Sequence, residues 1–575
     1  MKEETLKYLS QDLICLINVM STFNKSIFDK YQVNTTKVRS YSALSKLVYT
    51  TKYYKETGVK IPVISGYIEK IIRKGYYGGL VDVVEHLVQK AYKYDANSHY
   101  PAAMINDMPI GNPVISDEKD INKLFGFSYA KVTAPSVDIL AQPTLPFRDS
   151  RGVTTCPRGR FEGVWFTEEL KDSISRGYQV EIVSTVVFKR GKGLFDKFIN
   201  NLFASKAKAK EEGDSVGELV YKLLMNSFYG KCGQLEIENT YTMVDNKNLE
   251  DFGRKHNYDL SQEFDKLTLV RENGRFVPAL LELLNCKKDL KEETSLINKK
   301  SLEKNKKLPD KDKKGVKSCV AIAAAITAYA RISLNRFKNI PGNKYLGGDT
   351  DSVIMQNPLP EIFVGKQLGM MKFEDDITLG LYADKKLYYA VNSQGYENIK
   401  SRGVGKDFNR KDILKLPHFL LMLAGHVVTV NKTKFVITKK GAVEIKKVSL
   451  DTKIQKNTYK DVLTELGAYL ANNRHPKFLI SRYISSLRNI SDSQRDLLLN
   501  TDSKNLLKLL DIKHSQEDGV NNNDLSKSLS VVKESQSLGL TIYKAKFLKL
   551  IVIYPRVSDS TPEKKHLCEF DPPYI

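Results

Sequence analysis

The sequence predicts an α+β fold divided into two to four subdomains. Residues 214–230 carry apolar side chains at helical spacing, and residues 318–338 form an Ala-rich stretch that also favours a helix. Residues 102–200 instead alternate short strand-like runs with prolines and glycines. At 575 residues the chain is longer than one hydrophobic core ordinarily organises. Hydrophobic residues make up 41% and aromatic residues 10%, which excludes a disordered basic protein.

The remaining elements can be placed in chain order. Residues 1–78 mix polar connectors with a helical pattern formed by Leu6, Leu9, Leu13 and Leu16. Gly78-Gly79 then open two β-like stretches, the first from Leu80 to Val88 and the second leading to Tyr94-Asp95.

The later elements follow the same rules. The helix at 214–230 is expected to have an apolar face made of Val216, Leu219, Val220, Leu223 and Leu224. The Ala-rich helix should end before Pro341-Gly342, and the pair Gly347-Gly348 predicts a tight β-turn.

The chain carries a large positive charge, with 90 Lys and Arg against 67 Asp and Glu and a net charge of +23. This surplus favours nucleic acid as a partner before a membrane surface, although a generally Lys- and Asn-rich composition would also produce it. The six cysteines include no CxxC pair, which argues against structural zinc or a disulfide framework. Acidic residues at 3 and 4 argue against a signal or transit peptide, and apolar runs such as 547–554 are too short to cross a bilayer. We therefore expect a soluble protein with no membrane partner.

Residues 287–317 hold 12 lysines against 6 acidic residues. One interpretation is a solvated loop or frayed helix. The other is an insertion that contacts DNA phosphates without reading the base sequence, so that binding falls steeply with salt.

Two segments place carboxylates where a metal ion could be held. Asp95 ends an apolar-flanked strand before Pro101 turns the chain, while Asp349 and Asp351 flank one residue at a predicted hairpin. Strand residues two positions apart project to the same face, so the three carboxylates could meet. Together they would repel one another unless cations lay between them, and oxygen ligands of this kind favour Mg²⁺. A lone DxD is also compatible with a solvated turn. The choice between a metal site and such a turn therefore depends on the other motifs in the sequence.

A further motif lies on the helix at 214–230. Lys222, Asn226 and Tyr229 stand at i, i+4 and i+7, which places them on one face. Such a face is either solvent-exposed or suited to an incoming nucleotide, with Lys222 neutralising triphosphate charge and the other two bordering the base. Three lysines upstream are available to the same phosphates: Lys206, Lys208 and Lys210.

These three segments resemble the motifs of family B DNA polymerases, and within them the protein-primed branch. Residues 95–101 resemble DxxSLYP with His99 in place of Leu, and residues 222–230 resemble KxxxNSxYG without departure. Residues 345–352 resemble YxDTDS, except that Gly347-Gly348 separate Leu346 from Asp349. The motifs come in the family's order, and the likeness covers roughly residues 1–410.

Smaller motifs extend the resemblance. Residues 76–79 resemble the YxGG linker that channels DNA, residues 327–331 a template-contacting motif, and residues 386–388 the KxY motif that holds the primer terminus. By resemblance, the residues that contact DNA are Tyr76, Gly78, Gly79, Ser98, Ser227, Gly230, Thr327, Arg331, Thr350, Lys386 and Tyr388. Those that bind the nucleotide are Ala96, Tyr100, Lys210, Lys222, Asn226 and Tyr229. Tyr100 would stack under the sugar and exclude a 2′-hydroxyl, unless it is only a core aromatic beside Pro101.

The resemblance implies a right-hand polymerase fold, with an antiparallel palm sheet, helical fingers and a thumb. The expected segments are an exonuclease remnant and linker (1–78), the first part of the palm (79–106), a terminal-protein insertion with palm (107–198), fingers (199–233), a Lys-rich insertion of the strand-displacement type (234–316), the catalytic palm hairpin (317–410), and the thumb with the C-terminal region (411–575).

The implied activity is that of a DNA-directed DNA polymerase, a nucleotidyltransferase. Asp95, Asp349 and Asp351 would be the catalytic residues and would hold two Mg²⁺ ions, for which Mn²⁺ is a substitute. Its partners would be primer-template DNA, dNTPs and a terminal protein that supplies the priming hydroxyl. The setting would be a mitochondrial linear plasmid or a phage-infected bacterial cytoplasm. Tyr8 and Asp12 look like the third exonuclease motif, YxxxD, but only seven residues precede Tyr8, so we expect no proofreading by this chain.

Three other interpretations stay open. A reverse transcriptase would typically show a YxDD-like hairpin and a different fingers motif. An inactive DNA-binding remnant is opposed by the intact carboxylates and Lys222 and favoured by the missing exonuclease motifs. A membrane-surface protein would need an amphipathic Lys/Trp helix, which the sequence does not show.

Overall fold

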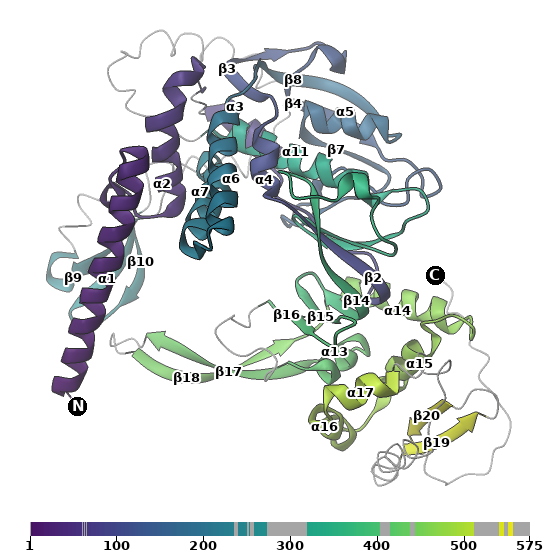
Figure 1. Cartoon of the computed structure of the whole chain (residues 1–575). Helices are drawn as coiled ribbons and strands as arrows, with labels where there is room; N and C mark the ends of the chain where they lie inside the picture. Colours follow the sequence, from purple (N-terminus) through teal and green to yellow (C-terminus); the bar gives the residue numbers. More distant parts are fainter. Residues whose placement is uncertain are drawn as a thin grey trace. The chain divides into compact units, whose positions relative to one another are not determined.

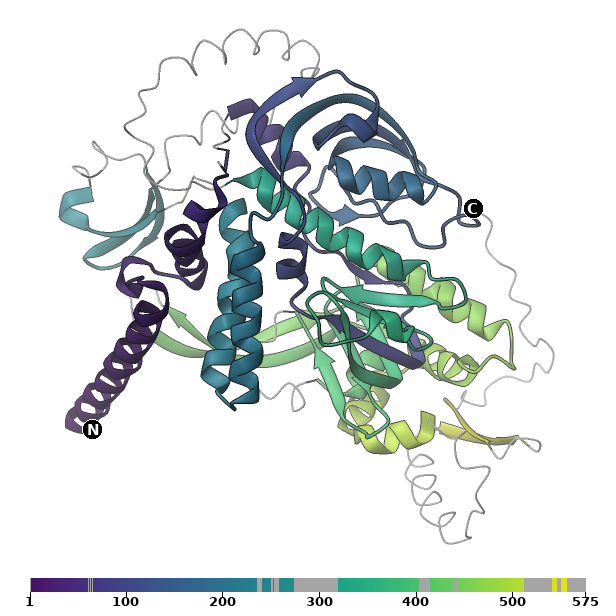
Figure 2. The ribbon, with the colours of Figure 1, turned by 45° about the horizontal axis from the view of Figure 1, so that its top comes forward.

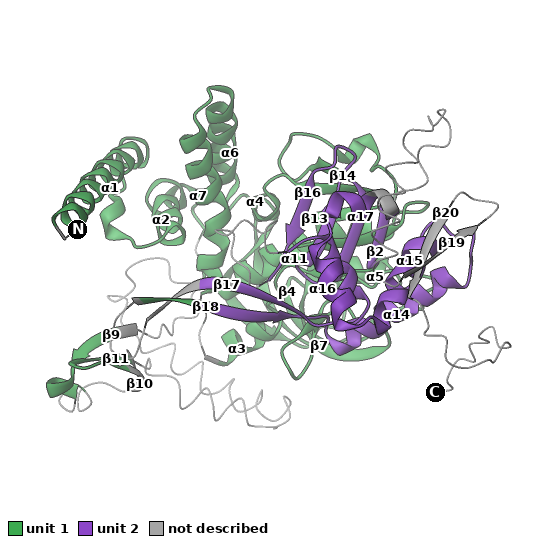
Figure 3. Cartoon of the chain, turned by 90° about the horizontal axis from the view of Figure 1, so that it is seen from below, with its two compact units in different colours: residues 1–84, 91–376, 435–446 green, residues 85–90, 377–434, 447–575 purple. Residues whose placement is uncertain are grey.

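The computed structural model describes most of the chain up to residue 510. The described residues are 2–234 except 60, 63 and 65, followed by 240–249, 252, 258–272, 319–402, 414–437, 443–510, 540–545 and 550–555. The Lys-rich stretch at 287–317, with both of its interpretations, lies outside them. The chain divides into two compact units (Figure 3): unit 1 comprises 1–84, 91–376 and 435–446, and unit 2 comprises 85–90, 377–434 and 447–575. The segment boundaries expected from the sequence stay predictions.

The predicted carboxylates lie on an antiparallel sheet of unit 1. Its strands pair in the order β1-β12-β13-β2, with bounds Val81–Val83, Tyr345–Asp349, Ser352–Met355 and Leu87–Ala96. On its other side β2 neighbours β14 (Met371–Asp384), whose start up to residue 376 belongs to unit 1.

The predicted turn at Gly347-Gly348 is wrong, because both glycines lie inside β12 and the chain turns at residues 350–351. A Cβ on Gly348 would meet the carbonyl oxygen of Ser352 at 2.4 Å, so this glycine serves close strand packing. The register between β12 and β13 shifts between Tyr345 and Gly347, which leaves Leu346 unpaired as a bulge.

A second sheet of unit 1 occupies the region where short strands and turns were expected. Its order is β3-β8-β4-β7, with bounds Met108–Ser116, Gln179–Gly191, Gly126–Thr133 and Arg160–Phe166. Helix α5 (Thr167–Ser175) follows β7, and a small hairpin joins β5 (Phe147–Arg148) to β6 (Thr154–Thr155). Trp165 is fully buried in the core of this region. A separate sheet has the order β10-β11-β9, with bounds Tyr258–Glu263, Leu267–Glu272 and Thr240–Asp245.

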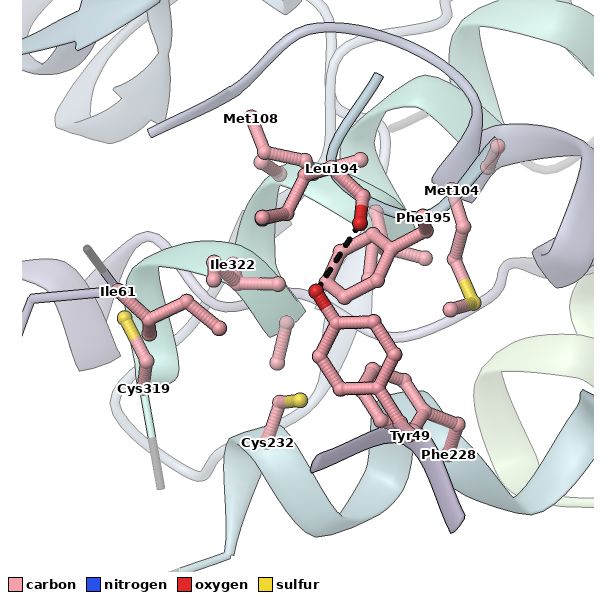
Figure 4. Packing of buried hydrophobic residues seen from close by; sticks show 14 of the residues in the cluster. Tyr49, Ile61, Met104, Met108, Leu194, Phe195, Phe228, Cys232, Cys319 and Ile322 are labelled. Atoms are coloured by element: carbon pink, nitrogen blue, oxygen red, sulfur yellow. Dashed lines mark hydrogen bonds between the residues drawn. The ribbon is translucent and has the colours of Figure 1, made fainter. Parts of the chain in front are cut away.

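The largest core of unit 1 is helical (Figures 1 and 2). It gathers α2 (Tyr41–Val48), α3 (Gly66–Lys74), α4 (His99–Met104), α6 (Asp196–Glu211), α7 (Ser215–Gly233) and α11 (Val320–Lys338). The prediction of an Ala-rich helix is confirmed by α11, whose small side chains let α3, α4 and α7 pack against it. In Figure 4 the Tyr49 ring packs against Phe195 and Phe228, and its hydroxyl donates to the Leu194 carbonyl at 3.0 Å.

The helix predicted at 214–230 is confirmed, but its expected apolar face is only partly right, because Leu224 is buried and Val220 packs against the core whereas Val216 and Leu219 do not. The side chains that α7 buries are Tyr221, Leu224, Met225, Phe228 and Cys232. Val216 and Leu219 are 70% and 55% exposed. The rings of Tyr221 and Phe228 offer more apolar area than Val216 and Leu219, so the helix turns these rings toward the core.

The helical pattern at the start of the chain forms α1 (Lys2–Tyr31). Leu6, Leu9, Leu13 and Leu16 are all about half exposed, whereas Ile27 and Tyr31 at the end of the helix are buried. The end of α1 therefore joins the helical core, where Lys30 donates a hydrogen bond to the Tyr221 hydroxyl of α7.

Unit 2 combines strands and helices around a core of its own. Strands β14 (Met371–Asp384), β15 (Leu387–Val391) and β16 (Glu397–Lys400) pair in that order, and β14 enters from unit 1. The helices are α13 (Leu416–Leu423), α14 (Lys456–Leu470), α15 (Phe478–Ser486), α16 (Asp492–Asn500) and α17 (Ser503–Leu510). Two ribbons pair β17 (Val428–Ile437) with β18 (Val443–Thr452) and β19 (Leu540–Ala545) with β20 (Leu550–Pro555). None of the helices in the described ranges is long and apolar enough to span a membrane.

Candidate active site

The structure brings the predicted carboxylates together at one end of the first sheet. Asp95 lies opposite Ser352, and Ser352 lies opposite Asp349, so the side chains of this row point to the same face. Asp351 occupies the turn between β12 and β13. Its carbonyl accepts from the Ala96 N–H at 2.8 Å, which ties the turn directly to the strand of Asp95.

The backbone of the turn is strained and held from both sides. Thr350 has a left-handed φ of 63°, which is uncommon for a β-branched residue. Its N–H donates to the Leu80 carbonyl at 2.8 Å, and its hydroxyl donates to the Asp349 carboxylate at 3.0 Å. The turn can thus present Asp351 in only a narrow range of positions.

The carboxylates strongly influence one another. Burial raises the pKa of Asp95 to about 7, and the charges of Asp351 and Glu374 add to the rise, whereas Lys93 and Lys222 oppose it. Burial also raises the pKa of Asp351, with contributions in the same direction from Asp349 and Glu374. The site therefore has an excess of negative charge that a cation would relieve.

Glu374 is a member of this group to which the sequence analysis assigned no role. It is near the start of β14, and its carboxylate lies 2.6 Å from the ammonium of Lys93, two residues before Asp95. The signal that would have found it is the acidic run at 374–376 directly after a strand start in a segment that resembles the family.

The group fits a hard divalent cation that shares its ligands with the substrate. Across the described ranges, no three His, Cys, Asp or Glu side chains are arranged to hold a metal ion by themselves. Mg²⁺ commonly takes one or two carboxylates and completes its shell with water and substrate phosphates. Asp95 and Asp351 are partly buried, and their pKa values are raised by that burial and by neighbouring carboxylates, so they are suited to that role.

The nucleotide-binding residues predicted on α4 and α7 lie in direct contact. Ser98 takes a left-handed φ of 51° and starts α4, which turns Tyr100 toward α7. The rings of Tyr100 and Tyr229 stack with centroids 4.2 Å apart and an interplanar angle of 24°. The expectation that Pro101 turns the chain is wrong. Pro101 lies in the first turn of α4, where a backbone N–H has no helical partner and its loss costs no hydrogen bond.

The predicted linker motif completes the same contact. A Cβ on Gly79 would lie 2.6 Å from Cγ2 of Thr350 and 2.9 Å from the Tyr100 hydroxyl. Gly78 is exposed and has no neighbour within 4 Å of that position. Tyr76 instead lies against the end of α7, where a Cβ on Gly233 would be 2.6 Å from its hydroxyl. Three motifs far apart in sequence therefore touch at Gly79.

The lysines expected at the triphosphate also gather near α7. Lys222 and Asn226 are exposed on one face of α7, with Ser227 partly exposed and Gly230 exposed beside them. Burial lowers the pKa of Lys206, and the charges of Lys222, Lys210 and Lys372 contribute in the same direction. Lys208 points elsewhere and pairs with Glu212 at 3.7 Å.

Arg331 and Thr327 are buried rather than exposed to a template. The Arg331 guanidinium binds the Glu169 carboxylate at 2.6 and 2.8 Å and donates to the carbonyls of Tyr77 and Gly78 at 2.6 and 2.9 Å. Thr327 donates to the Ala324 carbonyl within its own helix. Arg331 thus fixes the backbone of the linker, and its predicted template contact, which stays a prediction, would require this pair to open.

Two other predicted motifs lie on other elements, one in unit 2 and one on α1. Lys386 and Tyr388 belong to unit 2, where Lys386 takes a left-handed φ of 59° between β14 and β15 and the Tyr388 ring lies 5.0 Å from that of Tyr382. Tyr8 and Asp12 are exposed on α1. The proposed roles of both motifs stay predictions.

Comparison with known proteins gives a consistent family. Residues 1–335 match the model of DNA polymerase type B, organellar and viral. A probable DNA polymerase of Agaricus bitorquis is 32% identical over 470 residues, which cover 79% of this chain and 56% of that protein. A probable DNA polymerase of Podospora anserina is 28% identical over 457 residues, covering 72% of this chain and 35% of the relative. The chain therefore spans about half or less of the length of these relatives.

A solved structure shows the same fold. Phi29 DNA polymerase complexed with primer-template DNA superposes with a TM-score of 0.51 and 16% identity, covering 75% of this chain and 70% of that one. The predicted α+β fold of the right-hand polymerase type is confirmed by this likeness.

Proposed function

Since the chain belongs to the organellar and viral type B DNA polymerases, we propose that it is a DNA-directed DNA polymerase that adds dNTPs to a primer 3′-hydroxyl. The observation that carries the proposal is the group of partly buried, like-charged carboxylates on adjoining strands and the turn between them, in which Asp95 has its pKa raised to about 7. Such a group is costly to fold unless it binds cations, and phosphoryl transfer is the chemistry that uses them.

Each part of the site has a task in this reaction. Asp95 and Asp351 would hold Mg²⁺ ions, with Asp349 and Glu374 beside them, and the bound ions would activate the 3′-hydroxyl and stabilise the leaving pyrophosphate. Lys206, Lys210 and Lys222 would bind the triphosphate as point charges.

The stacked tyrosines would shape the base and sugar site. The rings of Tyr100 and Tyr229 stack with their centroids 4.2 Å apart and form one apolar surface. A bound nucleotide would displace this stack or extend it. Because the Tyr100 hydroxyl packs over Gly79, its ring has little freedom to move away from a 2′-hydroxyl. This supports the proposed discrimination against ribonucleotides.

The biological setting that we propose is protein-primed replication of a linear plasmid in mitochondria or of a phage genome. The support is the organellar and viral family and the similarity to phage polymerases, such as the DNA polymerase of Bacillus phage phi29, 24% identical over 246 residues. A terminal protein would dock on the region 107–198. The absence of proofreading by this chain stays a prediction, tested by incubating a labelled primer-template with Mg²⁺ and no dNTPs.

Primer extension tests the proposed function. The purified chain should extend a labelled primer on a template in the presence of Mg²⁺ and four dNTPs, and Asp351→Asn should abolish extension. Asp138→Asn, at an exposed position of the second sheet region, should extend as the wild type does. Failure of the wild type under all divalent cations would favour the inactive DNA-binding remnant, and activity of Asp351→Asn would refute the assigned site.

A further inference from the structure

One exposed lysine close to the carboxylates has no role in the function proposed above. Lys372 is the second residue of β14, after the fully buried Met371. Among the described residues, no carboxylate lies within ion-pair distance of the Lys372 ammonium. The nearby Lys93 ammonium, by contrast, pairs with Glu374.

The backbone around Lys372 is fixed to the strand of Asp95. The Asn97 N–H donates to the Met370 carbonyl, and the Gly369 N–H donates to the Asn97 carbonyl, both at 2.9 Å. A Cβ on Gly369 would be 2.9 Å from that of Ala102, so the segment also lies against α4. The start of β14 thus has little freedom relative to the carboxylates.

Strand alternation sets the face on which Lys372 lies. Lys372 and Glu374 are two residues apart on β14, as Lys93 and Asp95 are on β2, and successive alternate residues share a face. The 2.6 Å contact between Glu374 and Lys93 shows that the two strands present these residues to the same side. Lys372 therefore lies on the face of the catalytic carboxylates.

Lys372 also lies near enough to the lysines of the fingers helices to influence them. Its charge acts on Lys206 of α6 together with those of Lys210 and of Lys222 on α7, with the Glu218 carboxylate opposing them. The charge of Lys222 in turn acts on Asp95, so lysines from three separate elements influence the region of the carboxylates, and the positive charges outnumber the one acid. Like charges held together in this way are relieved by a polyanion.

We propose that Lys372 binds the β- and γ-phosphates of the incoming nucleotide from the β14 side and holds the leaving pyrophosphate with Lys206 and Lys222. In the transfer, the 3′-oxygen forms a bond to the α-phosphorus as the bond from the α-phosphorus to the bridging oxygen breaks. The electron pair leaves with the pyrophosphate, and the hydroxyl proton passes to solvent. Lys372 takes no part in the bond changes, and its charge stabilises the leaving group.

This inference rests on the proposed function, but it can be tested without turnover. Isothermal titration calorimetry with Mg²⁺ and inorganic pyrophosphate, and separately with a dNTP, measures binding to the full chain. Lys372→Gln should weaken both about tenfold, the loss expected for one charge-assisted contact, and Lys372→Arg should recover most of the affinity. Lys366→Gln, an exposed lysine six residues earlier, is the matched control and should bind as the wild type does.

The outcomes separate the two proposals. Wild-type binding of pyrophosphate that Lys372→Gln weakens, in a chain that extends no primer, would keep this inference and overturn the proposed function. Unchanged pyrophosphate and dNTP affinities in Lys372→Gln would overturn the inference, as would an equal loss in Lys366→Gln. A loss confined to primer-template affinity would also overturn it, because Lys372 would then bind the DNA backbone.

Discussion

The contact at Gly79 allows a sharp test, because a neighbouring glycine provides the control. In Gly79→Ala the new methyl group would lie 2.6 Å from Cγ2 of Thr350 and 2.9 Å from the Tyr100 hydroxyl, where ordinary contacts begin at 3.4 Å. The turn that carries Asp351, or the ring of Tyr100, must therefore shift by about 0.8 Å or more. Gly78→Ala adds the same methyl group one residue earlier, where nothing lies within 4 Å.

A displacement of this size has a known order of effect on catalysis. A misplacement of about 1 Å at reacting groups costs roughly 10²-fold in rate, so Gly79→Ala should lower single-turnover nucleotide addition about 10²-fold. With primer-template saturating, so that the DNA contact predicted for Gly78 does not limit the rate, Gly78→Ala should stay within about twofold of the wild type, because surface changes of this kind are nearly neutral. Rapid-quench primer extension at saturating dNTP measures both.

A second substitution identifies the clash as the cause. Thr350→Ser removes Cγ2 but keeps the hydroxyl that donates to Asp349. In the Gly79→Ala background it should therefore recover part of the lost rate. Equal rates for the two alanine variants would refute the packing argument, and a Gly79→Ala defect that Thr350→Ser leaves unchanged would show that the clash with Thr350 is not its source.

Three further predictions follow from single contacts. Tyr100→Val should raise ribonucleotide incorporation, measured as the ratio of rNTP to dNTP addition, and unchanged discrimination would remove the steric role of this ring. The folded-state pKa of Asp95 is raised to about 7 from 3.8, so between these values the unfolded chain is ionised while the folded chain holds the proton. The free energy of unfolding therefore falls as the pH rises from about 4 through 7. Without divalent cations, Asp95→Asn should therefore raise the melting temperature at pH 8 but hardly at pH 4, and the reverse pattern would contradict the burial of this carboxyl. Glu169→Leu should cost about 3–5 kcal/mol by leaving Arg331 buried and unpaired, and Arg331→Met in that background should recover part of it in denaturant unfolding, whereas additive losses would exclude a coupled pair.

The sequence predicted those parts of the fold that depend on residues close together in the chain. The helix at 214–230 and the Ala-rich helix follow from short-range spacing, and the hairpin with Asp349 and Asp351 follows from its motif. The apolar face of α7 could not be derived in this way. Its orientation depends on which rings find partners in α2 and α6, and those partners are far away in sequence.

The residues that were missed depend on strand neighbours. Glu374 and Lys372 gain their importance only because the start of β14 is bonded to the segment after Asp95. Arg331 was expected to face the template because its motif suggested it. Its burial follows from Glu169, which lies 162 residues earlier and gives no signal of its own in the sequence.

The central claim, that Asp95 and Asp351 form a cation-dependent transfer site, is tested most directly by Mn²⁺ binding. Electron paramagnetic resonance would count bound Mn²⁺ in the chain with a dideoxy-terminated primer-template and the next dNTP, so that no turnover occurs. We predict that Asp351→Asn loses tightly bound Mn²⁺ that the wild type and Asp138→Asn retain. Equal Mn²⁺ binding by all three proteins would contradict the assignment of these carboxylates.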